Sequence, residues 1–253
     1  MKLDQIYLVS PKKEMVDLAE LKSLEDRLKV KLPDDYCEFL IKFGAGEFCG
    51  WLSHFNSSDL FEGQKSYQNL VREFYLWDTK TSALSKQEVI KATWLARSID
   101  GDEIVFHPSK SPGLFLLPRN LETILPIGSS WGQVLDFFAY SGVIFKKSEF
   151  PWFCTFKDRC RIHLVKDEEI DHNEAEQLVL NTFGPSRKVQ DESCEFTCFF
   201  CPAISGYVHV YSDNFDIHHD LDSDQRVSLA AELTFKPKGF RIVEHFRPTI
   251  PPS

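Results

Sequence analysis

Residues 32–48 read LPDDYCEFLIKFGAGEF, and this stretch predicts a short helix with a marked start and a marked end. Proline suits the first helical position, which needs no backbone N–H, and the two aspartates after it favour the positive end of the helix dipole. The apolar residues then recur at helical spacing and form one stripe, which comprises Tyr36, Phe39, Leu40 and Phe43. We therefore predict that Phe39 and Phe43 are buried and that Gly44 ends the helix with a positive φ.

The segments around this helix predict an α+β domain over residues 1–149. Before it, Ser10 is a predicted N-cap for a helix whose apolar face includes Leu21, Leu24 and Leu28. Residues 56–63 are predicted to be a loop. After residue 92 the pattern changes to strands, and Asp100-Gly101 supplies the positive φ of a tight hairpin turn. Further strands are predicted at 113–117 and 123–127, and Ser130 caps a closing helix. The order of helices, antiparallel meander and helix is typical of an α+β fold.

Residues 150–253 predict a second, smaller α+β domain of unknown type. A strand at 160–165 precedes a helix that Asn173 begins and Gly184 ends. Strand-like runs follow at 194–201, 206–211, 227–235 and 239–246, and the acidic stretch 212–225 is predicted to be a loop. Residues 248–253 are predicted to be extended. The sequence leaves open whether this domain is a recognition surface or a structural extension.

Composition and charge exclude several classes of protein. The net charge of −9 argues against nucleic-acid binding, which needs a basic surface. No run approaches the roughly 20 apolar residues of a membrane helix, and residues 1–10 lack the features of a secretory signal. Seven cysteines, an odd number, favour reduced thiols and a cytoplasmic location. Residues 151–253 carry 17 Asp and Glu against 11 Lys and Arg, an acidity suited to a basic protein partner.

Three patterns suggest chemistry, and each has a structural interpretation that we favour. Gly128-Ser129-Ser130-Trp131-Gly132 matches the G-x-S-x-G motif of serine hydrolases, but Ser130 is also a predicted helix cap and the strands such a fold needs are missing. Cys194, Cys198 and Cys201 lie in one predicted strand, where alternation turns Cys201 away from the others. The stretch 213–224 is rich in carboxylates but does not fit an EF-hand, although a looser metal site stays open. We predict no catalytic residue, cofactor or metal.

Residues 10–140 contain a series of short pieces in a fixed order: the leucines of the first helix, Leu32-Pro33-Asp34-Asp35-Tyr36, Phe39-Leu40, Phe43-Gly44-Ala45-Gly46, Ile99-Asp100-Gly101-Asp102-Glu103-Ile104 and the closing helix at 130–138. This order resembles the SUKH superfamily, which includes the yeast cell-wall synthesis regulator family and many bacterial immunity proteins. The family commonly has Asn-Gly where this chain has Gly44-Ala45-Gly46. Residues after about 150 lie outside the resemblance.

The resemblance implies an antiparallel sheet with packed helices and a binding module rather than an enzyme. Many members look like immunity proteins that neutralise polymorphic toxins by direct binding, so a basic toxin domain is the expected partner. A regulatory or scaffold subunit of a cytosolic complex is the alternative, and a serine hydrolase using Ser130 is a remote one. We predict the partner contacts at the rim after the first core helix and at the hairpin turn, namely Glu47, Trp51, Asp100, Asp102 and Glu103.

Overall fold

The computed structural model describes residues 1–145, 147–166, 170–190, 197–211 and 213–248. Contacts divide the chain into two compact units, the first made of residues 1–8 and 13–156 and the second of residues 9–12 and 157–253. The sequence places the domain boundary after residue 149. In the structure the strand that follows, Trp152–Thr155, continues the first sheet.

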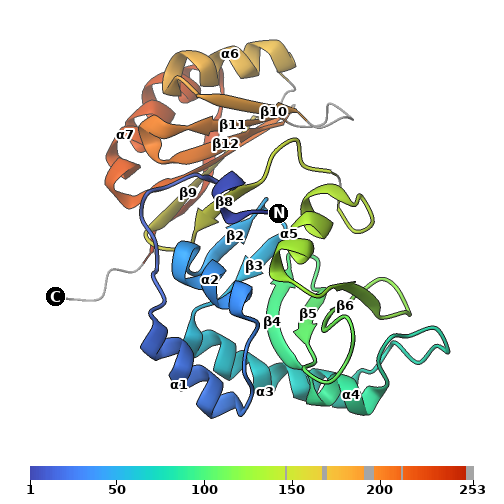
Figure 1. Ribbon diagram of the computed structural model, residues 1–253. Helices are drawn as coiled ribbons and strands as arrows, with labels where there is room; N and C mark the ends of the chain where they lie inside the picture. Colours follow the sequence, from blue (N-terminus) through green and yellow to red (C-terminus); the bar gives the residue numbers. More distant parts are fainter. Residues whose placement is uncertain (146, 167–169, 191–196, 212, 249–253) are drawn as a thin grey trace. The chain divides into compact units, whose positions relative to one another are not determined.

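Within its described residues, the first unit is a sheet of eight strands with five α-helices (Figure 1). The strand order is β1-β8-β2-β3-β4-β5-β6-β7, and every neighbouring pair is antiparallel except β1 with β8. The strands are β1 (Tyr7–Leu8), β2 (Gly46–Phe48), β3 (Leu52–His54), β4 (Thr93–Ser98), β5 (Glu103–Phe106), β6 (Leu114–Leu117), β7 (Leu125–Gly128) and β8 (Trp152–Thr155). The helices are α1 (Leu18–Leu28), α2 (Asp34–Phe43), α3 (Ser57–Glu73), α4 (Lys86–Lys91) and α5 (Trp131–Tyr140).

Helix α2 is the predicted core helix. Phe39 and Phe43 are 0% and 2% exposed, and Gly44 has a φ of +74°. A Cβ atom at Gly44 would lie 2.0 Å from the carbonyl oxygen of Glu14, so glycine is needed for space as well as for conformation. The ring of Phe39 lies 5.6 Å from that of Phe153 in β8, and α2 therefore packs on the sheet through aromatic contacts.

Two predicted boundaries in the first unit are wrong. The first helix begins at Leu18, because Asp17 and Glu20 form a reciprocal capping box there. Ser10 is not its cap, and its hydroxyl donates a hydrogen bond to Asp220 within the second unit. Residues 57–63, predicted to be a loop, form the first turns of α3, which Asn56 caps.

As far as its residues are described, the second unit is a six-stranded antiparallel sheet with two α-helices, and the strand order is β10-β11-β12-β13-β9-β14. Its strands are β9 (Arg159–Val165), β10 (Arg187–Gln190), β11 (Thr197–Cys201), β12 (Gly206–Val210), β13 (Asn214–Asp220) and β14 (Arg241–Phe246). Helix α6 spans His172–Phe183, and α7 (Asp224–Ala230) continues into a π-helical turn, Ala231–Phe235. Both units combine sheets with helices, which confirms the predicted α+β fold class.

Two predictions for the second unit are wrong. The acidic loop 212–225 contains the strand β13, in which Phe215, Ile217 and His219 alternate inward between polar residues. The predicted strand 227–235 is helical, since Val227, Ala231 and Phe235 lie four residues apart and bury one face. The end of the chain after Pro248, predicted to be extended, lies outside the described residues.

Candidate functional site

Three turns of the first unit lie at the same end of its sheet. Residues 49–51 connect β2 to β3, residues 99–102 connect β4 to β5, and residues 118–124 connect β6 to β7. Because the strands between them are antiparallel neighbours, these alternate connections meet at one end. The backbone N–H of Ile99 donates to the carbonyl of Trp51 over 2.9 Å, which joins the first two turns. Two predicted contact residues, Trp51 and Asp100, are thus brought to one end of the sheet.

A row of polar residues crosses the sheet beside these turns. In the strand register Glu47 is opposite Ser53, Ser53 is opposite Arg97, and Arg97 is opposite Glu103. Residues directly opposite one another in antiparallel strands have side chains on the same face. The register therefore places Glu47 and Glu103, two further predicted contacts, in one cross-strand row with Arg97 between them.

Asp102 is held inside the domain. Its side chain is 2% exposed, and its two carboxylate oxygens accept hydrogen bonds from the Ser98 hydroxyl over 2.6 Å and from Arg119 N over 2.8 Å. Gly101 beside it has a φ of +88°, as the predicted Asp-Gly turn requires. These bonds fix the shape of the turn, so Asp102 supports the position of Asp100 and is not available to a partner.

Glu103 is also buried, at 3% exposure. Trp94 Nε1 donates to one oxygen over 2.6 Å, and the Arg97 guanidinium donates to the other over 2.9 and 2.7 Å. Burial raises the pKa of Glu103, and the hydrogen bonds from Arg97 and Trp94 oppose that shift. Glu103 therefore anchors Arg97, whose own side chain is 43% exposed, so the charge that reaches the surface here is that of the arginine.

The accessible part of this region mixes apolar and charged side chains. Ile99 is 53% exposed, Asp100 is exposed, and Glu47 is half-buried. Trp51 is half-buried because its indole stacks on Phe145, with ring centroids 4.9 Å apart and planes within 8°. Aromatic and arginine side chains supported by neighbours are common energetic centres of protein interfaces. We name this set the candidate surface, and its members are Glu47, Trp51, Arg97, Ile99 and Asp100.

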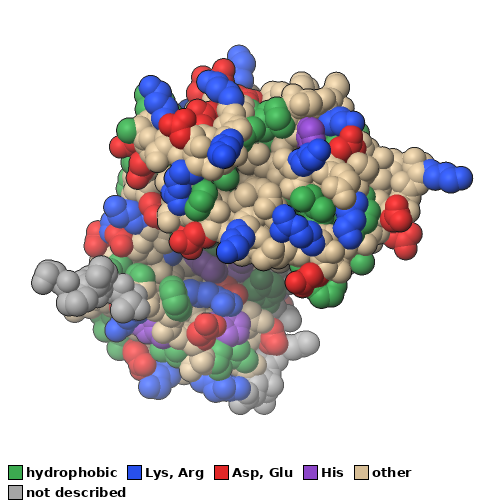
Figure 2. Space-filling model, turned by 90° about the horizontal axis from the view of Figure 1, so that it is seen from below, with side chains coloured by type: hydrophobic (Ala, Val, Ile, Leu, Met, Phe, Trp, Pro, Cys, Tyr) green, Lys and Arg blue, Asp and Glu red, His purple; other side chains and the backbone are tan. Residues whose placement is uncertain are grey.

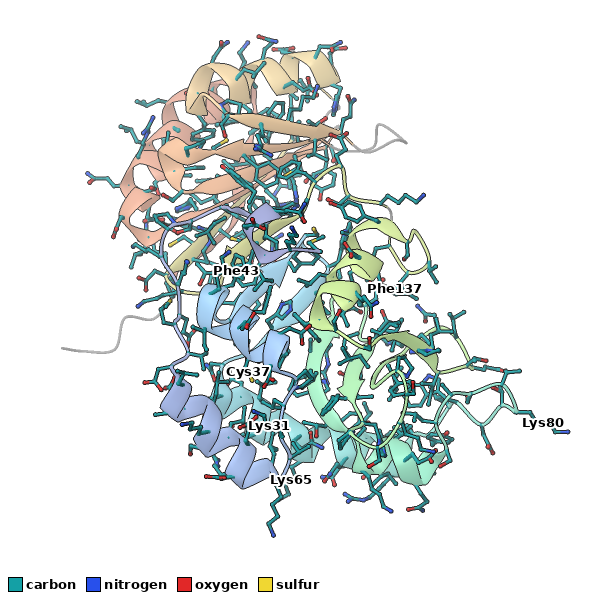
Figure 3. All side chains as sticks on the ribbon, viewed as in Figure 1. Lys31, Cys37, Phe43, Lys65, Lys80 and Phe137 are labelled. Carbon is teal, nitrogen blue, oxygen red and sulfur yellow. The ribbon has the colours of Figure 1, made fainter. Side chains whose placement is uncertain are left out.

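The face of the molecule in Figure 2 carries charges of both signs. Figure 2 shows Lys and Arg side chains interspersed with Asp and Glu on the face that it presents. Lys31, for example, forms an ion pair with Asp34 over 3.1 Å, and Figure 3 shows Lys80 reaching outward from the loop between α3 and α4. Arg97 and Asp100 of the candidate surface likewise carry charges of opposite sign.

Ser130 has a structural role. Its hydroxyl accepts a hydrogen bond from the backbone N–H of Gln133 over 3.3 Å, as an N-cap does. The amide oxygen of Gln133 in turn accepts from Ser129 N over 2.7 Å, so the G-x-S-x-G residues form the start of α5. Among the described residues, no histidine or carboxylate forms a hydrogen bond with the Ser130 hydroxyl, and a nucleophile would need such a base.

The free thiols of the described chain include Cys37, Cys49, Cys160 and Cys201. Cys198 and Cys201 both lie in β11, where a spacing of three turns their side chains to opposite faces. Cys194, the third member of the predicted cysteine group, lies outside the described residues. Among the described residues, no helix combines the length and apolar character needed to cross a bilayer.

The comparisons with known proteins identify the first unit. The sequence profile of the SMI1 / KNR4 family (SUKH-1) matches residues 15–136, from the segment before α1 to the middle of α5. A comparison with curated proteins finds no match. The matched span contains α2, the β4–β5 hairpin and the first half of α5, and these pieces carry the resemblance in the sequence. Residues 15–136 of this chain therefore belong to the SUKH superfamily.

Proposed function

We propose that the first unit is a non-enzymatic protein-binding module and that the chain is an immunity protein, which neutralises a toxin by direct binding in the cytoplasm. Membership of residues 15–136 in the SUKH-1 family is the observation that carries this proposal. The structural role of Ser130 supports binding over hydrolysis, because its hydroxyl is already engaged at the start of α5.

We place the partner contact at the candidate surface. Ile99 and Trp51 supply apolar area, and Arg97 and Asp100 supply charges of both signs beside it, a composition found in protein interfaces. The bonds of Asp102 and Glu103 hold this surface in place before any partner arrives. A surface that is ordered in advance loses less conformational entropy on binding.

A direct test is co-expression of the full chain with the toxin domain encoded by a neighbouring gene, followed by co-purification and a cell-survival assay. Ile99→Asp places a charge in the centre of the candidate surface and should weaken binding by about 10-fold or more, the effect of losing about 1.4 kcal/mol. Leu76→Asp is the matched control, because Leu76 is 57% exposed and lies outside the candidate surface. It should bind like the unaltered chain.

Two results would contradict this proposal. If no neighbouring gene encodes a toxin that binds the chain, and the chain protects no cell, the immunity function is wrong. If a toxin binds but Ile99→Asp and Leu76→Asp weaken it equally, the contact lies elsewhere on the molecule. Capture of a defined subunit of a cellular complex in place of a toxin would favour the regulatory alternative.

A further inference from the structure

A group of metal-ligating side chains gathers in the second unit. Cys160 of β9 and His219 of β13 are directly paired in the antiparallel ladder, so their side chains leave the same face of the sheet. Asp224 is the first residue of α7, and one possible ligand atom from each of the three lies within 4.8 Å of the others. All three are buried, at 1%, 0% and 8% exposure.

His245 of β14 adds a fourth side chain to this group. Strand β14 pairs with β9, and His245 lies opposite Ile162. Ile162 is two residues from Cys160 along β9, so His245 and Cys160 have their side chains on the same face of the sheet. The Nε2 atom of His245 lies 2.8 Å from Oδ1 of Asp224. Three neighbouring strands and one helix thus bring together a sulfur, an oxygen and two imidazole nitrogens.

His219 has an atom that the protein leaves unsatisfied. Its Nδ1 lies 3.0 Å from the carbonyl oxygen of Asp220, which can only accept, so Nδ1 carries the proton and Nε2 has a lone pair. Nε2 has no hydrogen-bond partner among the described residues, and it lies 3.8 Å from Oδ1 of Asp224. An acceptor left unpaired in the interior costs free energy. An imidazole oriented by a carbonyl at one nitrogen is typical of histidines that ligate metals through the other.

We propose that Cys160, His219, Asp224 and His245 bind one Zn²⁺ ion. Thiolate, imidazole and carboxylate are the ligands that Zn²⁺ takes in proteins, and four of them complete a tetrahedral site. Three of these side chains are at most 8% exposed, so no open position faces solvent as a catalytic zinc would require. The ion would be structural, and it would tie β9, β13 and β14 to the start of α7.

Neighbouring charges shape this site. Nη2 of Arg247 lies 2.7 Å from Oδ2 of Asp224, which leaves Oδ1 turned toward His219 and His245. Nε of Arg247 is also 3.3 Å from Nε2 of His245, and that contact gives way when His245 ligates the ion.

The first experiment uses the full chain, purified without a polyhistidine tag and stripped with a chelator. Titration with Co²⁺ should saturate at one ion per chain and give a sulfur-to-cobalt charge-transfer absorption, which Zn²⁺ then abolishes. Zn²⁺ should also raise the melting temperature of the stripped chain, because an ion that binds only the folded state stabilises it. Absence of both the absorption and the thermal shift would overturn the proposal, and this result needs no variant.

Variants then locate the site. Cys160→Ala should abolish the charge-transfer absorption. Substitution of a residue that only supports a metal ligand typically weakens metal binding by roughly 10–100-fold, so His219→Gln, which removes a ligand, should weaken Co²⁺ binding by more than that. Cys201→Ala is the matched control, because Cys201 is a buried free thiol of the same unit outside the group. It should bind Co²⁺ like the unaltered chain. If Cys160→Ala keeps the absorption while Cys201→Ala loses it, the ion lies elsewhere and the assignment is wrong.

Discussion

The buried imidazole of His54 should make the first unit sensitive to acid. The side chain is fully buried, and its ring centroid lies 4.4 Å from that of Phe39 and 5.5 Å from that of Trp131. Neither ring nitrogen has a hydrogen-bond partner of ordinary geometry among the described residues. The backbone near Leu52 and Gly46 raises the pKa of His54 less than burial lowers it. Burial lowers the pKa of His54 from 6.5 to about 3.

This difference in pKa becomes a dependence of stability on pH. Between pH 6.5 and about 3 the unfolded chain binds a proton at His54 that the folded chain excludes. The full stability is present above pH 6.5, and it falls by about 1.4 kcal/mol for each pH unit below that value. From pH 7.5 to pH 4.5 the loss from this one group is about 3 kcal/mol, a large part of the usual 5–15 kcal/mol of a domain.

Urea unfolding followed by tryptophan fluorescence measures this loss in the first unit alone, because all five tryptophans lie in residues 13–156. The variant His54→Phe lacks the titrating group. Between pH 7.5 and pH 4.5 the unaltered chain should therefore lose about 3 kcal/mol more of its free energy of unfolding than the variant loses. His107→Gln, which removes another histidine of this unit, should keep the steep dependence. Parallel pH profiles for the unaltered chain and His54→Phe would refute the reasoning.

Three substitutions test the other structural arguments, each by urea unfolding with tryptophan fluorescence. Phe39→Ala should cost about 3–5 kcal/mol, because it empties a fully buried aromatic site, and a near-neutral value would mean that α2 does not face the core. Gly44→Ala should cost more than about 1 kcal/mol, since its Cβ would meet the Glu14 carbonyl, and a stabilised variant would contradict that contact. Ser130→Ala should cost only about 1 kcal/mol; complete loss of an esterase activity would instead favour the hydrolase.

Local signals in the sequence were enough to predict α2 and the β4–β5 hairpin. The start and end of α2 are determined by residues within the stretch itself, as the φ of Gly44 confirms. The Asp100-Gly101 turn likewise needs only its own two residues. The sequence pattern predicted a loop where β13 lies, because the charged residues of this strand find their ion-pair partners on a neighbouring strand. Asp216, for example, is paired with Arg161 and His163 of β9.

The candidate site was less predictable for the same reason. Asp102 and Glu103 look exposed in the sequence because they adjoin a turn. Their partners come from β4 and, for Asp102, also from Arg119 after β6, and only the folded sheet brings these residues together. The proposed zinc ligands are likewise far from one another in the sequence. Cys160 and His245 meet His219 only because β9 lies between β13 and β14 in the sheet. No local spacing could have indicated that group.

The place of β8 in the first sheet has a practical consequence. This strand lies between β1 and β2, and it supplies Phe153, which is fully buried against Phe39. A fragment that ended at residue 149 would expose the backbone of β2 as an open sheet edge, and such edges recruit strands from other molecules. We expect that fragment to aggregate and a fragment ending at residue 156 to stay dispersed, although both contain the whole span that matches the family.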